Sequence, residues 1–158
     1  MFRDMIRRNK QLTEEECIGI LKHEPRGVLS VQGDDGYPYG MPIDHWYCEA
    51  DGRIYFHCGQ GGHRLDSILR NDKVSFCVYD AGYREEGDWA LNIRSVIVFG
   101  RMRVVEDHAR AIEITRQLSF KYTADAQYIE EEIRLHGAGV LVLALEIEHM
   151  CGKLVKES

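Results

Sequence analysis

A glycine-rich segment followed by two basic residues is the part of this sequence best suited to bind an anion. The segment spans residues 59–62 with the sequence Gly-Gln-Gly-Gly, and His63 and Arg64 follow it directly. The apolar spacing of residues 63–70 predicts a short helix, so the basic pair would stand at a helix N-terminus, where free backbone N–H groups favour a phosphate. Arg64 can also direct two donors at one phosphate group. The pattern is equally typical of a solvated loop with a surface arginine.

The same stretch contains side chains that could bind a metal ion instead. His57, Cys58 and His63 are residue types that zinc accepts, with His149 or Cys151 as a fourth ligand. However, adjacent residues of a strand point to opposite faces, which separates His57 from Cys58. We therefore expect no metal site.

Other common catalytic patterns are missing from the sequence. It has no G-x-S-x-G nucleophile motif, and no base is placed to activate Cys58. No G-x-G-x-x-G motif follows a strand, which argues against a Rossmann dinucleotide site.

Composition excludes several further classes of protein. The net charge of −6 argues against general nucleic-acid binding. No apolar run of about 18 residues is present to span a membrane, and no apolar segment follows the basic N-terminus as in a secretory signal. Five cysteines at irregular spacings, without a C-x-x-C pair, indicate free thiols and a cytoplasmic location.

The elements that position these residues are mainly strands joined by hairpins. Thr13 and Glu16 form a capping-box pattern, which predicts a helix ending near His23. Strands are predicted at residues 27–31, 39–47, 53–57, 74–79, 93–105 and 140–147, and further helices at 63–70, after Asp107 and at about 125–135. This order predicts a mainly β protein, a small antiparallel six-stranded barrel with flanking helices, in one domain of residues 1–158.

Five segments together resemble the Nim-type nitroimidazole-resistance proteins, within the pyridoxamine 5'-phosphate oxidase-like superfamily. The segments are residues 1–5, residues 33–39 with Pro42 beyond them, residues 55–65, residues 71–78 and residues 94–100. The similarity continues in register to Gly152 and Lys153. Each segment alone is moderately specific, whereas five in this order and spacing are a strong signal. The resemblance implies an antiparallel six-stranded split β-barrel that binds flavin between the subunits of a homodimer.

The resemblance also assigns flavin contacts along the chain. The strand of residues 40–43 would lie along the flavin, His57 and Cys58 would meet its ring or ribityl chain, and His63 and Arg64 would hold its phosphate. The implied cofactor-binding residues are Gly40, Met41, Pro42, Ile43, His57, Cys58, His63, Arg64, Ser95, Met150 and Lys153. The cofactor is expected to be FMN, with FAD as the alternative. Many relatives have two permanent cations where this chain has His63 before Arg64, so phosphate affinity is expected to depend on pH.

The resemblance implies that the protein is an FMN-dependent oxidoreductase. It would pass electrons from a reduced nicotinamide, NAD(P)H, to an electron-poor small molecule, with reduction of a 5-nitroimidazole to its amine as the family's presumed reaction. His57 is the candidate catalytic residue, as a proton donor at the reacting face. The alternative is a carrier that binds flavin or haem without turnover, in which His57 or His149 would be an axial ligand of the haem.

Overall fold

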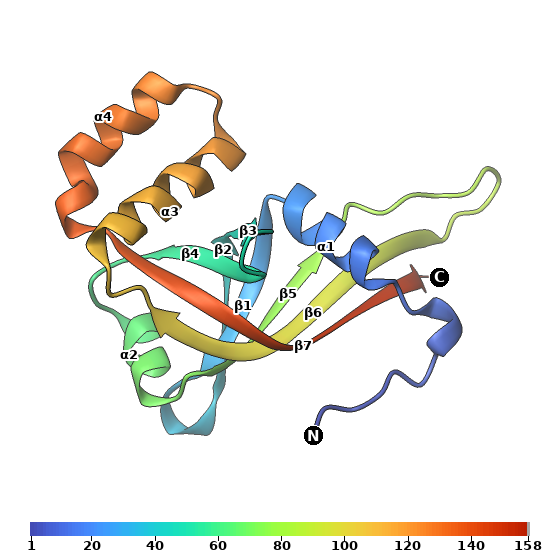
Figure 1. Ribbon diagram of the computed structural model, residues 1–158. Coiled ribbons are helices and arrows are strands. Elements are labelled where there is room, and N and C mark those ends of the chain that lie inside the picture. Colours follow the sequence, from blue (N-terminus) through green and yellow to red (C-terminus); the bar gives the residue numbers. More distant parts are fainter. Residues whose placement is uncertain (158) are drawn as a thin grey trace.

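One antiparallel sheet of seven strands curls into a half-barrel and is flanked by four helices (Figure 1). The computed structural model describes residues 1–157. The strands are β1 (Arg26–Gln32), β2 (Pro38–Asp44), β3 (Trp46–Cys48), β4 (Arg53–Cys58), β5 (Lys73–Tyr79), β6 (Leu91–Val104) and β7 (Leu141–Glu157). The helices are α1 (Glu14–His23), α2 (His63–Arg70), α3 (His108–Tyr122) and α4 (Ala126–His136). The expected mainly β, antiparallel architecture with flanking helices is confirmed.

The expected number of six strands is wrong, because the strand predicted over residues 39–47 is two strands. The sheet order is β2-β1-β5-β6-β7-β4-β3, so β2 and β3 are its two edges although they are consecutive in the chain. The chain passes from one edge to the other at His45, whose side chain is 0% exposed. Curling of the sheet brings these edges together, consistent with a split barrel.

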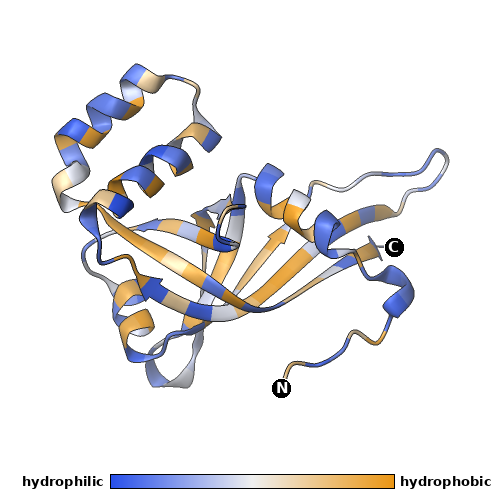
Figure 2. Ribbon diagram, viewed as in Figure 1, coloured by the Kyte–Doolittle hydropathy of each residue, from blue (hydrophilic) through white to orange (hydrophobic). Residues whose placement is uncertain are grey.

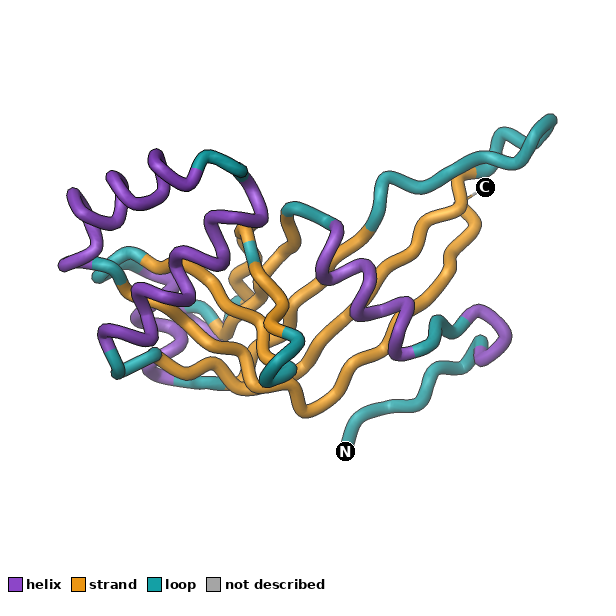
Figure 3. Tube along the Cα trace, turned by 45° about the horizontal axis from the view of Figure 1, so that its top comes forward, coloured by secondary structure: helices purple, strands orange, loops and turns teal. Residues whose placement is uncertain are grey.

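The last strand also differs from its predicted end at residue 147. β7 continues to Glu157 because it pairs with β6 over the whole length of that strand, from Leu91 opposite Glu157 to Val104 opposite Leu143. A shift in register between Phe99 and Gly100 marks a bulge in this long pair. The outer halves of β6 and β7 therefore form an arm that extends away from α3 and α4 (Figure 3).

Hydrophobic residues are buried on both faces of the sheet. The main core lies on the inner face, where Phe56 and Phe76 are fully buried and Leu21 of α1 covers them. A second, smaller core lies on the opposite face of β4 and β7, where Ile114 of α3 packs near Val142. Figure 2 shows the result: the strands are largely hydrophobic, whereas α3 and α4 alternate between hydrophobic and hydrophilic residues.

A polar clamp formed by His45, Lys121 and Tyr122 holds the end of α3 against the chain between β2 and β3. The Lys121 ammonium donates to the carbonyls of Glu24 and His45 at 2.8 and 2.9 Å. The Tyr122 hydroxyl accepts a hydrogen bond of 2.9 Å from the backbone N–H of His45. The His45 Nε2 lies 2.7 Å from the Leu21 carbonyl, to which it donates. The clamp thus fixes α3 relative to both edges of the sheet.

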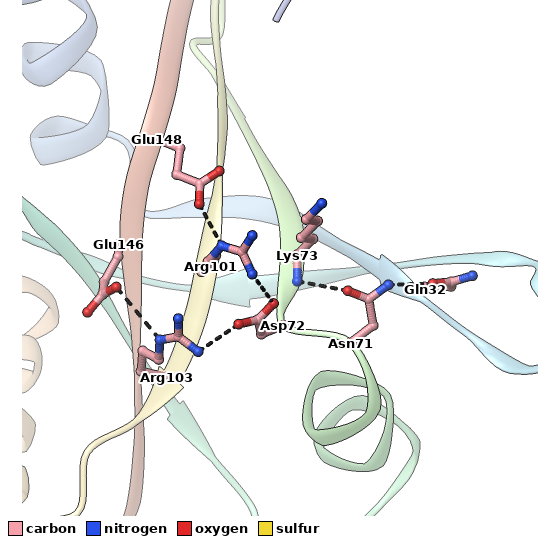
Figure 4. Close-up of polar contacts among 8 residues, drawn as sticks. All are labelled: Gln32, Asn71, Asp72, Lys73, Arg101, Arg103, Glu146 and Glu148. Atoms are coloured by element: carbon pink, nitrogen blue, oxygen red, sulfur yellow. Dashed lines mark hydrogen bonds and ion pairs between the residues drawn. The ribbon is translucent and has the colours of Figure 1, made fainter. Parts of the chain in front are cut away.

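A network of ion pairs joins the C-terminal end of α2 to β6 and β7 (Figure 4). Asp72 accepts from Arg101 at 2.9 Å and from Arg103 at 2.6 Å. These arginines also pair with carboxylates of β7, Arg101 with Glu148 at 2.7 Å and Arg103 with Glu146 at 3.7 Å. Exposed pairs contribute only about 0–1 kcal/mol each, so the network mainly sets where α2 ends relative to the sheet.

Among residues 1–157, no helix has the length and hydrophobicity needed to cross a bilayer.

Candidate functional site

Arg64 lies in the first turn of α2, directly after the glycine loop. Gly62 precedes the helix with a φ of 108°, a conformation that favours glycine, and no side chain of the described chain caps the helix. Leu65 and Ile68 hold the helix in the main core. The Nε atom of Arg64 is buried and has no hydrogen-bond partner within residues 1–157. Because buried polar atoms are almost always paired, this guanidinium at a helix N-terminus fits a bound anion.

His63, the other basic residue of the pair, already has partners. Its ring stacks on Tyr39 of β2, with the centroids 4.1 Å apart and an angle of 11° between the planes. Its Nε2 lies 3.6 Å from a carboxylate oxygen of Asp34. Arg64 is therefore the cation better placed to hold a phosphate. A phosphate contact of His63, with the pH dependence that it would cause, stays a prediction.

Two adjoining hollows lie between the edge of the sheet and the α3–α4 pair. The first has a volume of about 540 Å³, and the second of about 530 Å³. The first is lined by Arg26, Pro42, Ile43, Asp44, His57 and Leu118. The second shares Asp44, His57 and Leu118 with it and continues between α3 and α4. Together they form one groove, which we call the His57 groove.

His57 is open to this groove on the outer face of β4. It lies opposite Val142 in register, whereas Cys58 is buried in the main core on the inner face. Neighbouring protein atoms still desolvate the imidazole, and this desolvation lowers the pKa of His57, with a smaller opposing effect from Asp44. The imidazole is therefore neutral near pH 7. The thiol of Cys58 points away from the groove, so only its backbone could meet a ligand there.

Strand β2 connects the two candidate regions. Tyr39, which stacks on His63, is near its beginning, and Ile43 lines the groove near its end. A strand rises about 3.3 Å per residue, so the two positions are about 13 Å apart. Gly40 and Pro42 lie on the exposed side of β2, while Met41 contacts the main core. A ligand with a phosphate at one end and a flat ring at the other fits this arrangement.

The remaining predicted contacts lie elsewhere in the same chain. Ser95 of β6 and Lys153 of β7 are paired in register, three and four strands from β2. At about 4.8 Å per strand, Ser95 is about 14 Å and Lys153 about 19 Å from β2 along the sheet. Met150 packs against the main core. The structure thus brings Pro42, Ile43 and His57 together at the groove, whereas Ser95, Met150 and Lys153 are not among the residues that line it in their own chain.

The side chains proposed as metal ligands do not converge. His57 faces the groove, Cys58 the core and His63 the ring of Tyr39. His149 stacks on Phe2, with the ring centroids 4.8 Å apart. In the described part of the chain, no group of three or more His, Cys, Asp or Glu side chains is placed to hold a metal ion.

Sequence reasoning missed the helical wall of the groove. Thr115 of α3 is only 8% exposed, and its hydroxyl oxygen is a second buried polar atom without a hydrogen-bond partner in residues 1–157. It lies in the apolar stripe of α3, between Ala111 and Leu118. A threonine within such a stripe was a visible signal, but its hydrogen bonding could not be read from the pattern.

Comparisons with known proteins identify relatives of the whole domain. The family model described as pyridoxamine 5'-phosphate oxidase matches residues 13–154. A putative 5-nitroimidazole antibiotic resistance protein from Bacteroides thetaiotaomicron has 17% identity and a TM-score of 0.76, covering 93% of this chain and 87% of its own. A conserved hypothetical protein from Mycobacterium tuberculosis has 18% identity and a TM-score of 0.77, covering 95% and 90%. An FAD and haem binding protein from Mycobacterium smegmatis has 22% identity and a TM-score of 0.73, covering 92% and 73%. A comparison with curated protein sequences found no match.

Proposed function

The chain belongs to the pyridoxamine 5'-phosphate oxidase family, and from this premise we propose that it is a flavin-dependent reductase of small electron-poor molecules. The observation that carries the proposal is the unpaired Arg64 Nε at one end of β2, with the His57 groove at the other end. The structural neighbours support it, since one is described as a putative nitroimidazole resistance protein and another as an FAD and haem binding protein. All five cysteines are free, which supports a reducing compartment, the cytoplasm.

Each part of the site has a separate task in this proposal. A bound flavin would supply the redox chemistry, accepting electrons from NAD(P)H and passing them to the substrate. Arg64 and the first N–H groups of α2 hold its phosphate, and the exposed side of β2 supports its ring. We assign FMN, which has one phosphate group, and not FAD, which has two. The reason is that Arg64 is the one side-chain cation with an unpaired buried donor in the described chain.

His57 faces the reacting compound from the floor of the groove. The sequence suggested a proton donor, but the lowered pKa leaves the imidazole neutral near pH 7. A neutral imidazole still donates one N–H hydrogen bond. We therefore propose that His57 orients the substrate at neutral pH and donates a proton only in more acidic solution.

Purified protein reconstituted with FMN is expected to be yellow and to oxidise NAD(P)H when a 5-nitroimidazole is added, with the amine as product. Absorption spectra and mass spectrometry of the released cofactor and product test this. Protein that takes up neither FMN nor FAD would contradict the proposal. A Soret band after addition of haem, without nitro reduction, would favour the alternative of a carrier.

We further propose that the active form is a homodimer. Val28 of β1 and Ile97 and Phe99 of β6 lie on the outer face of the two strands that flank β5, and they are 37%, 38% and 37% exposed. Such a row of large apolar side chains on one face favours association with a second copy. Ser95 and Lys153 also lie about 14 and about 19 Å from β2 along the sheet of their own chain, so a flavin site on β2 that includes them would be one shared with a second copy.

Light scattering at micromolar concentration is expected to give the mass of a dimer. Ile97→Glu places a charge in the apolar row and is expected to give a monomer that binds FMN at least tenfold more weakly, because the shared site is lost. Leu135→Glu is the matched control, since Leu135 is 53% exposed on α4, away from this face. A wild-type monomer that binds flavin tightly would refute the homodimer.

A further inference from the structure

The part of the His57 groove between α3 and α4 contains a buried hydroxyl with no partner. Thr115 is more than nine-tenths buried, and its Oγ1 lies without a hydrogen bond among residues 1–157. A threonine within a helix commonly donates to the carbonyl four residues earlier. Ser119, one turn later on the same side, does so, donating to the Thr115 carbonyl at 2.7 Å. The Thr115 hydroxyl therefore has hydrogen-bonding capacity that the described residues leave unused, and Thr115 is one of the residues that line the second hollow.

The walls around this hydroxyl are mainly apolar. Leu118, Ile129, Ile133 and Val140 line the same hollow, which has a volume of about 530 Å³. An apolar wall disfavours charged ligands, which would lose their hydration there. The size suits a small neutral molecule.

Charged groups of the groove are already paired with neighbours. Asp44 forms an ion pair of 2.7 Å with Arg26, and Glu132 lies 3.9 Å from His136. Both carboxylates line the second hollow and would repel an anion entering it. The occupant is therefore neutral, with one polar group that reaches the inner hydroxyl.

We propose that the Thr115 hydroxyl positions the substrate by donating a hydrogen bond to an oxygen of its electron-poor group, a nitro or quinone oxygen. This rests on the proposed function, because the same groove reaches Pro42 and His57, where the flavin ring would lie. Nitro and quinone groups offer acceptor oxygens and no donors, so a lone hydroxyl donor complements them. Thr115 is thus a positioning and specificity residue, and the α3–α4 pair supplies the substrate pocket.

Three proteins test this: the wild type, Thr115→Val and Thr115→Ser, each loaded with FMN and studied without a reductant, so that no turnover occurs. Calorimetry measures the affinity for a 5-nitroimidazole and for the same imidazole without the nitro group. Thr115→Val keeps the shape of the side chain and removes the hydroxyl. We expect it to bind the nitro compound about five- to tenfold more weakly, because one hydrogen bond is lost. Thr115→Ser keeps the hydroxyl and is expected to stay within about twofold.

Three further readouts separate positioning from a structural role. FMN affinity is expected to be equal in all three proteins. The midpoint of thermal unfolding of flavin-free Thr115→Val is expected to equal or exceed that of the wild type, because valine removes an unpaired buried polar atom. The imidazole without the nitro group is expected to bind the wild type and Thr115→Val equally.

Two results would overturn the inference. One is equal affinity of the wild type and Thr115→Val for the nitro compound, and the other is an equal loss for both imidazoles. Failure of the wild type to bind FMN would instead refute the proposed function. In that case the same titrations of flavin-free protein still decide whether Thr115 binds the nitro group.

Discussion

Arg64→Ala is expected to bind FMN about tenfold to hundredfold more weakly than the wild type while remaining folded. A charged, bidentate contact with a phosphate contributes about 1.5–3 kcal/mol, and its loss gives this range of affinity. The side chain can be removed without breaking a hydrogen bond at Nε, because that buried atom has no partner in the described chain. Quenching of flavin fluorescence during titration measures the affinity, and circular dichroism checks the fold.

Arg70→Ala is the matched control on the same helix. Arg70 lies at the other end of α2, where it pairs with Asp34 at 2.9 Å, and its side chain is 54% exposed. Its removal is expected to change FMN affinity by less than about twofold, since exposed ion pairs are worth little. Arg64→Lys should fall between the wild type and Arg64→Ala, because an ammonium cannot form the bidentate contact. Full flavin affinity in Arg64→Ala would show that the phosphate binds elsewhere.

Stability is expected to fall by about 3 kcal/mol as the pH is lowered from about 6.5 to about 4, because of His45 alone. Burial, and to a smaller extent the nearby Lys121 ammonium, together lower the pKa of His45 to about 4. The Nδ1 atom is buried and has no partner within residues 1–157, so a proton there would find no acceptor. That proton would also make the ring positively charged beside a second cation, since Nε2 lies 3.3 Å from the Lys121 ammonium.

The sign follows from which state binds the proton. The pKa of His45 is about 4 in the folded protein and near its ordinary value of 6.5 in the unfolded chain. Between these values the unfolded chain binds more protons, so lowering the pH favours unfolding. Lys121, whose pKa burial lowers to about 8, stays charged throughout this range.

Urea unfolding at several pH values between 7 and 4 measures the effect, with His45→Gln as the control. Glutamine keeps an N–H donor for the Leu21 carbonyl but does not titrate. The difference in stability between the two proteins is therefore expected to shrink or change sign as the pH falls, while loss from carboxylate titration is common to both. Parallel curves for the two proteins over this range would show that His45 does not control acid stability.

The sequence by itself determined the local elements and the candidate anion site. The capping box of α1 is present as expected, with Glu16 N–H donating to Thr13 Oγ1 at 3.2 Å and Thr13 N–H to Glu16 at 2.8 Å. The two-residue period of a strand already placed the side chains of His57 and Cys58 on opposite faces of the sheet. Such features depend on neighbours within a few residues, and a short pattern contains those neighbours. The glycine loop and Arg64 could be found for the same reason.

Tertiary structure alone decided how these elements are joined into a site. Residues 39–47 keep a strand-like pattern across His45, and only the curling of the sheet breaks the strand there, by bringing its two edges together. The groove needs Thr115 of α3 beside His57 of β4, which are far apart in sequence. Tertiary contacts also decide which basic residue is available to bind an anion. His63 contacts Asp34 and Tyr39, whereas Nε of Arg64 has no hydrogen-bond partner in the described chain. Contacts between residues that are distant in sequence depend on long-range packing. The hydrophobic periodicity of one segment does not specify them.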